Sequence, residues 1–105
     1  MGVRRAARGL LFTREVTPIE QARGLGPTMG AELRRVGIST KEELQAIGWQ
    51  EAWARLIERY PGRLNRNAAY GLAAAVLEMD WRLLPAEVKA EILTLSQQFR
   101  RHLIL

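Results

Sequence analysis

Gly24, Leu25 and Gly26, followed by Pro27, are the residues of this chain whose types and spacing could do chemistry. Two glycines around one apolar residue make a tight turn, and the apolar pattern on either side predicts a short helix before it and another after it. Such a turn points backbone N–H groups outward at the start of the second helix, where an anion binds favourably. The hydroxyl of Thr28 can add a hydrogen bond. The turn therefore predicts a seat for a phosphate group.

Positive charge is available to support such a seat. The chain has 16 Lys and Arg against 11 Asp and Glu, a net charge of +5, and fourteen of the basic residues are arginines. This excess permits nucleic-acid binding without demanding it, because an arginine-rich composition also follows from a GC-rich genome and basic tails are often simply solvated. The predicted supporting charges lie near the turn (Arg23, Arg34, Arg35) and in the N-terminal arm (Arg4, Arg5, Arg8).

Residues for catalysis or metal binding are scarce. The chain has no cysteine and one histidine, His102, so that no thiol or second imidazole can share a metal. Glu42 and Glu43 are accounted for as helix-capping residues. General acid–base catalysis needs a positioned group in a pocket, and no spacing here indicates one. We therefore predict no catalytic residue, no metal site, no cofactor and no small-molecule substrate.

Localisation is indicated by what the sequence does not contain. The absence of cysteine suits the cytoplasm. No apolar run approaches the ~20 residues of a membrane-spanning helix, and the N-terminal apolar patch is too short for a signal peptide. We expect a cytoplasmic protein without membrane contact.

The elements that position the turn are predicted to be helices. Residues 1–16 show no clean period and read as a basic flexible arm. Thr17 and Pro18 predict the start of a short helix over residues 18–23, with Glu20 completing a capping box. Residues 27–36 follow as the second helix, which Gly37 ends in a left-handed conformation.

Four further helical segments are expected after Gly37. Ser39 or Thr40 caps the third, with Glu42 or Glu43 three residues later. The fourth covers residues 50–60 and the fifth, rich in alanine and capped by Asn65, residues 66–79. Pro85 starts the last. No segment alternates with period two, so the prediction is an all-α fold, a compact bundle of five or six short helices.

The three tryptophans raise the possibility of base stacking. Trp49, Trp53 and Trp81 could serve as stacking platforms for single strands. The helical spacing of Trp53 with Leu56 and Ile57 favours the core instead. We expect Trp53 and Trp81 to be buried and Trp49 to be partly exposed.

The surroundings of the turn resemble the helix-hairpin-helix motif. The resemblance rests on Ile19, Ala22, the Gly24-Leu25-Gly26 hairpin, Gly30 and Leu33. It implies that Leu25 plugs the core between the two helices. In DNA-binding members the hairpin N–H groups hold a backbone phosphate without reading sequence, whereas in other relatives the hairpin is only architectural.

A wider pattern covers residues 23–98. Its most specific elements, after the glycine hairpin, are the runs Val36-Gly37-Ile38-Ser39-Thr40-Lys41-Glu42-Glu43-Leu44 and Asp80-Trp81-Arg82-Leu83-Leu84-Pro85. This pattern resembles the C-terminal domain of the TfoX/Sxy family, bacterial regulators of natural competence. Typical members carry a separate α/β domain ahead of this one, and we expect residues 1–16 to stand in its place. The family contributes no catalytic residues.

Both ends of the chain carry apolar residues, Leu10-Leu11-Phe12 and Leu103-Ile104-Leu105. They either fold back onto the bundle or form a surface for a protein partner or a second copy, since exposed apolar area is costly.

The sequence thus predicts a basic arm (residues 1–16), a TfoX C-terminal-like helical domain (17–102) and an apolar tail (103–105). We expect a non-enzymatic bacterial regulatory module that contacts double-stranded DNA independently of sequence through the hairpin. The alternative is a protein-interaction or oligomerisation domain in which the hairpin only packs.

Overall fold

The computed structural model describes residues 16–104 of the chain, with side chains as far as His102. In this range five α-helices and three single-turn 3₁₀ helices follow one another, so the predicted all-α bundle is confirmed. Their order is η1 (Ile19–Gln21), α2 (Pro27–Arg35), α3 (Lys41–Ile47), α4 (Trp49–Arg59), η2 (Pro61–Arg63), α5 (Arg66–Leu77), η3 (Trp81–Leu83) and α6 (Ala86–Ile104). The predicted arm with Arg4, Arg5, Arg8 and Leu10-Leu11-Phe12 lies outside the described residues.

The first predicted helix is a single 3₁₀ turn, and its predicted capping box is wrong. Pro18, not Thr17, precedes η1 as its cap, without any side-chain hydrogen bond. The carboxylate of Glu20 instead accepts two hydrogen bonds from Arg34, at 2.6 and 2.8 Å. A bidentate bond to a guanidinium is stronger than one to a neutral backbone N–H, which explains the outcome.

The start of the described chain is joined to the start of α3. The N–H of Ile19 donates to the carbonyl of Ser39 at 3.0 Å, and the N–H of Lys41 donates to the carbonyl of Thr17 at 2.9 Å. The N–H of Thr17 donates to the carboxylate of Glu42 at 2.9 Å. Ile19 is fully buried beneath these bonds, so η1 is fixed in place although it is only one turn long.

Helix α3 begins at the predicted capping box, in the register of Thr40 and Glu43. The N–H of Glu43 donates to the Thr40 hydroxyl at 3.0 Å, and the Glu43 carboxylate accepts from the N–H of Thr40 at 3.2 Å. Gly37 ahead of it has a φ of +91°, as predicted for a left-handed helix end. The local sequence therefore determines this junction.

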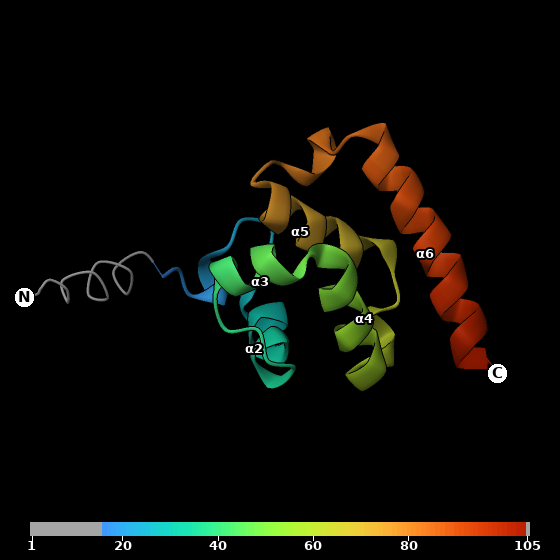
Figure 1. Ribbon diagram of the computed structural model, residues 1–105, viewed down its shortest axis with the longest axis horizontal. Helices are drawn as coiled ribbons and strands as arrows, with labels where there is room; N and C mark the ends of the chain where they lie inside the picture. The colour runs from blue at the N-terminus through green and yellow to red at the C-terminus, as the bar shows by residue number, and fades with distance from the viewer. Residues whose placement is uncertain (1–15, 105) are drawn as a thin grey trace, which may run out of the picture.

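Helix α5 occupies the middle of the bundle, as its alanine content predicts (Figure 1). Helices α3, α4 and α6 all pack against it. Asn65 caps it by accepting a hydrogen bond from the N–H of Ala68 at 2.8 Å. It ends at Leu77, earlier than expected, because Glu78 adopts a left-handed conformation with φ 55°.

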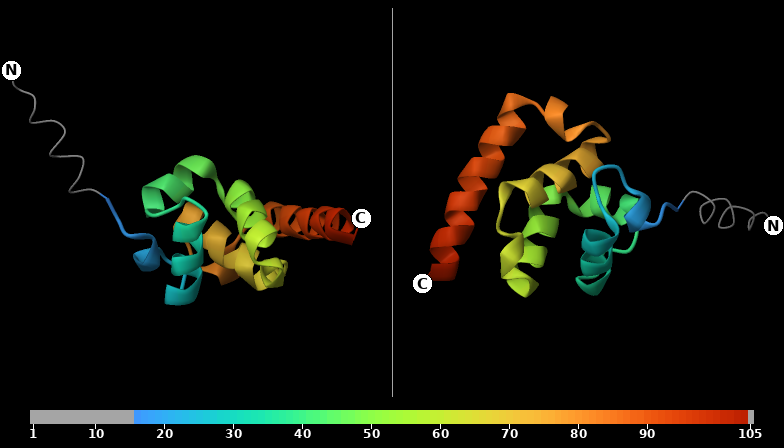
Figure 2. Two further views of the ribbon diagram at one scale, coloured as in Figure 1. Left: turned by 90° about the horizontal axis from the view of Figure 1, so that it is seen from below. Right: turned by 180° about the vertical axis from the view of Figure 1, so that it is seen from behind.

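Helix α6 flanks α5 on the side opposite the η1–α2 pair (Figures 1 and 2). Ile92 and Ser96 are its buried residues, and Val88, Leu95 and Phe99 pack against the core beside them. The helix continues to Ile104, into the segment that the sequence assigned to an apolar tail. The side chains of residues 103–105 lie outside the described part.

Two of the three predictions for tryptophan are wrong. Trp53 is fully buried, as expected, and its indole N–H donates to the carbonyl of Arg63 at 2.8 Å. Trp49 is buried as well, because it faces the core from the first turn of α4. Trp81 is 51% exposed, because η3 is a single turn at the surface.

Candidate nucleic-acid interface

The glycine hairpin joins η1 to the N-terminus of α2. Gly24 has a φ of +87°, a conformation that favours glycine, and the N–H of Leu25 donates back to the carbonyl of Ala22 at 3.2 Å. Gly26 is extended and caps α2, with Pro27 in the first helical position. Leu25 is partly buried against the core, in accordance with its predicted role as a plug.

Gly24 packs directly against the central helix, α5. A Cβ added to Gly24 would lie 3.1 Å from the carbonyl oxygen of Gly71 and 3.3 Å from the Cβ of Ala74. A Cβ added to Gly71 would lie 2.9 Å from the carbonyl oxygen of Gly24, a distance that real structures do not tolerate. The hairpin and α5 therefore touch backbone to backbone, which only a pair of glycines allows.

The solvent side of the hairpin is open. A Cβ added to Gly26 would meet nothing within 4 Å, and both Gly26 and Thr28 are exposed. The first intrahelical bond runs from the N–H of Gly30 to the carbonyl of Gly26 at 2.9 Å. The N–H groups of Gly26, Thr28 and Met29 find no acceptor among residues 16–104. The N–H of Leu25, which the sequence also assigned to the phosphate seat, is used inside the hairpin.

The predicted arginines do not all gather at this end of α2. Arg23 is exposed beside the hairpin, where its charge contributes to lowering the pKa of Asp80. Arg34 and Arg35 lie in the last turn of α2. Arg35 is seven residues beyond Thr28, about 10 Å along the helix axis. The structure therefore brings Arg23, Gly24, Gly26 and Thr28 together and places Arg34 and Arg35 at the other end.

Arg34 is also neutralised. Its guanidinium donates to both carboxylate oxygens of Glu20, and these hydrogen bonds lower the pKa of Glu20 from 4.5 to about 2. Glu20 thus remains charged at any physiological pH and holds Arg34 along the side of α2. Arg34 is not a source of free positive charge for a ligand at the hairpin.

Trp81 lies beside the hairpin, a neighbour that sequence reasoning missed. Its ring stacks on Tyr70 at a centroid distance of 6.1 Å and an interplanar angle of 10°. A hollow of about 470 Å³ is lined by the two rings together with Gly24, Asn67 and Gly71. No local signal separates Trp81 from Leu84, which lies in the same connection between α5 and α6 and is buried.

Asp80 and Arg82 hold the turn that carries Trp81. The Asp80 carboxylate accepts from the backbone N–H of Arg82 at 2.9 Å and from its guanidinium at 3.0 and 2.6 Å. These bonds hold the pKa of Asp80 well below its usual range. Trp81, which stacks on Tyr70 of α5, is therefore held in a fixed turn next to the hairpin.

Neither a metal-binding cluster nor a membrane-spanning helix is present in the described part of the chain. Among residues 16–104, no three His, Asp or Glu side chains are placed to hold a metal ion. No helix within that range combines the length and apolar character needed to cross a bilayer.

Comparison with known proteins supports the family resemblance. The family model of the TfoX C-terminal domain matches residues 16–95. A similar solved structure is the crystal structure of an uncharacterized protein from Listeria monocytogenes in a triclinic form. It has a TM-score of 0.76 and 25% identity, and the match covers 80% of this chain and 94% of that chain. None of the curated proteins matches the chain. With the matched residues running from η1 into α6, the chain belongs to the TfoX C-terminal domain family, which supports a regulatory-type module.

Proposed function

We propose that this chain is a non-enzymatic regulatory module that binds double-stranded DNA through a backbone phosphate at the glycine hairpin. The observation that carries the proposal is the set of N–H groups on Gly26, Thr28 and Met29 at the start of α2, which have no acceptor among the described residues. Helix N-termini attract anions through such N–H groups and the helix dipole. Contacts of this kind position a protein on DNA without selecting a base sequence.

Two features near the hairpin support this function. Gly24 is packed against Gly71, so the N–H groups are held in place before any ligand arrives. Arg23 is exposed beside them and adds a positive charge. A preorganised site spends less free energy on ordering itself during binding.

The test is an anisotropy titration of a labelled duplex at several salt concentrations. We expect the logarithm of the affinity to fall linearly with the logarithm of salt, with a slope of about −0.9 per phosphate contact. Gly26→Asp places a carboxylate where the phosphate would lie and is expected to weaken binding at least tenfold. Its backbone conformation, φ −98° and ψ 176°, accepts any residue, so the variant is expected to fold.

Ala90→Asp is the matched control, because it adds the same charge on an exposed position of α6. Equal affinities of Gly26→Asp and Ala90→Asp would remove the hairpin from the interface. Absence of binding by the wild type at low salt and tens of micromolar protein would refute DNA binding altogether.

A protein-interaction module is the second candidate, favoured by exposed apolar side chains around η3. Leu77, Trp81 and Leu83 are 43%, 51% and 69% exposed. On this alternative the Gly24–Gly71 contact gives the hairpin a purely architectural role. Association through such a surface is nearly independent of salt, so sedimentation of the wild type and of Leu83→Ser across the same salt series separates the two candidates.

A further inference from the structure

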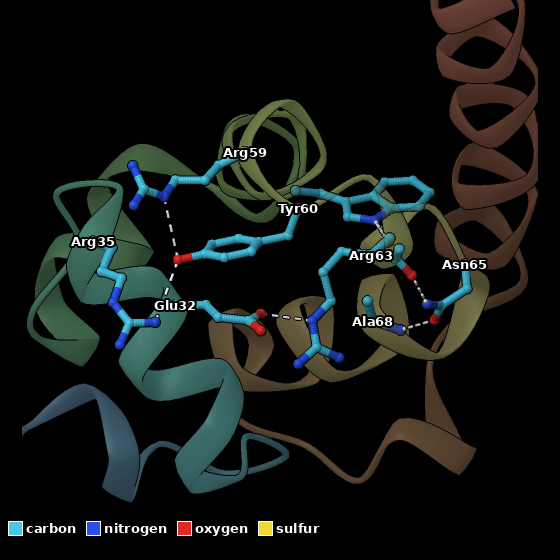
Figure 3. A network of polar contacts seen from close by, with 9 residues as sticks. Glu32, Arg35, Arg59, Tyr60, Arg63, Asn65 and Ala68 are labelled. Atoms are coloured by element: carbon cyan, nitrogen blue, oxygen red, sulfur yellow. Dashed lines mark hydrogen bonds and ion pairs between the residues drawn. The ribbon is translucent and has the colours of Figure 1, made fainter.

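Two arginines converge on one phenol at the end of α2 that is remote from the hairpin. The guanidinium of Arg35 donates to the Tyr60 hydroxyl oxygen at 3.4 Å, and that of Arg59 donates to the same oxygen at 3.3 Å. Figure 3 shows the two guanidinium groups approaching this oxygen from different helices, α2 and α4. Two positive charges therefore face each other across a single neutral group.

Two nearby carboxylates, those of Glu32 and Glu51, are committed to other arginines. Glu32 pairs with Arg63 at 2.6 Å, and Glu51 pairs with Arg55 at 3.0 Å. Figure 3 shows the Glu32 carboxylate directed to Arg63 rather than to Arg35. Glu58 lines a hollow together with Arg59 and Arg55. Neither Arg35 nor Arg59 forms an ion pair with any carboxylate in the described part of the chain.

Helix dipoles account for only part of this arrangement. Arg35 and Arg59 lie in the last turns of α2 and α4, where a positive charge is favoured. That preference is satisfied by any orientation of each side chain. The Arg59 guanidinium also lies over the Tyr60 ring, 5.6 Å from its centroid, which places it beside the phenol. Neither effect explains why Arg35 turns toward the same oxygen, where the two guanidinium groups repel each other.

From this geometry we infer that Arg35, Arg59 and Tyr60 form a second oxyanion site, which binds a phosphate group. Guanidinium groups recognise phosphate through charge-assisted, often bidentate, hydrogen bonds. The Tyr60 hydroxyl accepts from both arginines, so its own proton remains to be donated to a phosphate oxygen. The hydrogen bond from Arg35 lowers the pKa of Tyr60, which makes it a better donor.

The phosphate belongs either to a DNA backbone or to a small phosphorylated molecule. Arg35 lies seven residues after Thr28, nearly two helical turns, and both therefore lie on one side of α2. A duplex on that side would meet the hairpin and the arginine pair together. The site does not require the hairpin to bind DNA, because its own donors are sufficient for a free phosphate.

Inorganic phosphate is the probe, titrated into the wild-type chain at constant ionic strength with chloride as the balancing anion. The signals to follow by NMR are the Nε–H groups of Arg35 and Arg59 and the ring of Tyr60. We expect saturable shifts at these groups and about tenfold weaker phosphate binding in Arg35→Gln and in Arg59→Gln. Tyr60→Phe retains the ring and is expected to weaken binding by a smaller factor.

Arg100→Gln is the control, because it removes the same charge from an exposed position of α6. Equal phosphate affinities in Arg35→Gln, Arg59→Gln and Arg100→Gln would overturn the proposal, as would the absence of saturable shifts in the wild type. Gly26→Asp is expected to leave the phosphate titration unchanged, so failure of the hairpin proposal and failure of this one are distinguishable.

A second titration, with a short duplex, separates the two sources once inorganic phosphate has bound. Shifts of the same three side chains that inorganic phosphate reverses by competition would assign the site to a DNA backbone. Duplex binding without those shifts would assign it to a small phosphorylated molecule.

Discussion

The ion pair between Glu20 and Arg34 decides, at the scale of single residues, where charge is available around α2. Glu20 lies three residues after Thr17, which is the spacing of a capping box, although no such box forms. A partner fourteen residues away provides stronger bonds and takes the carboxylate. Arg23, just before α2, and Arg35, at the C-terminal end of α2, therefore lie at opposite ends of the helix, each with its own neighbours.

Replacement of Glu20 by Gln is expected to change how stability depends on pH. The pKa of Glu20 is about 2 in the folded chain against 4.5 for the free group, so the ionised carboxylate stabilises the fold above pH 4.5. That contribution is lost as the pH falls from 4.5 toward 2. Urea unfolding at a series of pH values should show Glu20→Gln less stable than the wild type at neutral pH, with the difference shrinking in acid.

Glu58→Gln provides the control for this series, because Glu58 is exposed and makes no ion pair in the described range. A difference between wild type and Glu20→Gln that stays constant with pH would contradict the role assigned to the ion pair.

The junction before α3 shows what local sequence determines at the scale of an element. Thr40 and Glu43 satisfy each other's backbone N–H groups, and Glu43 also accepts from the N–H of Ser39 at 2.7 Å. These bonds need only the spacing of neighbouring residues. Helix starts at Thr40 and Asn65 were therefore predictable. The element η1 proved shorter than expected, because its start is bonded to the segment that begins α3 and the chain becomes extended at Ala22.

Thr40→Ala is expected to destabilise the fold by about 1 kcal/mol, because the N–H of Glu43 loses its acceptor. Denaturant unfolding measures the change, and the slope with denaturant should stay the same. Ser39→Ala is the neighbouring control, since no hydrogen bond of the Ser39 hydroxyl is found in residues 16–104. Equal losses in the two variants would show that the cap contributes nothing specific.

The contact of Gly24 with Gly71 organises the whole molecule, because it attaches the hairpin to the central helix. Gly71→Ala removes a glycine from a helix interior, which by itself should stabilise the fold by up to about 1 kcal/mol. The new Cβ would lie 2.9 Å from the carbonyl oxygen of Gly24, and such overpacking costs typically 1–3 kcal/mol. We therefore expect a net loss of about 1 kcal/mol in urea unfolding.

Gly62→Ala is the matched substitution for that measurement, because a Cβ at Gly62 meets nothing within 4 Å. A gain of stability in Gly71→Ala comparable to that in Gly62→Ala would mean that the two backbones are not in close contact.

The helices and the glycine hairpin could be predicted from the sequence, but the residues that surround the candidate site could not. Glycine, proline and capping residues act on their neighbours, so their effects can be read locally. The exposure of Trp81 and the engagement of Arg34 by Glu20 depend on which distant segments meet. The convergence of Arg35 and Arg59 on Tyr60 is of the same kind, because it joins the ends of two helices that the chain order separates.

The backbone contact between Gly24 and Gly71 also limits how the hairpin could be reused. Short loops that fold by themselves can be grafted from one protein into another. This hairpin takes one of its walls from a helix that lies nearly half the chain away. The hairpin is therefore not expected to keep its structure outside this fold, because residues 16–36 grafted without α5 would lose the helix surface against which Gly24 packs.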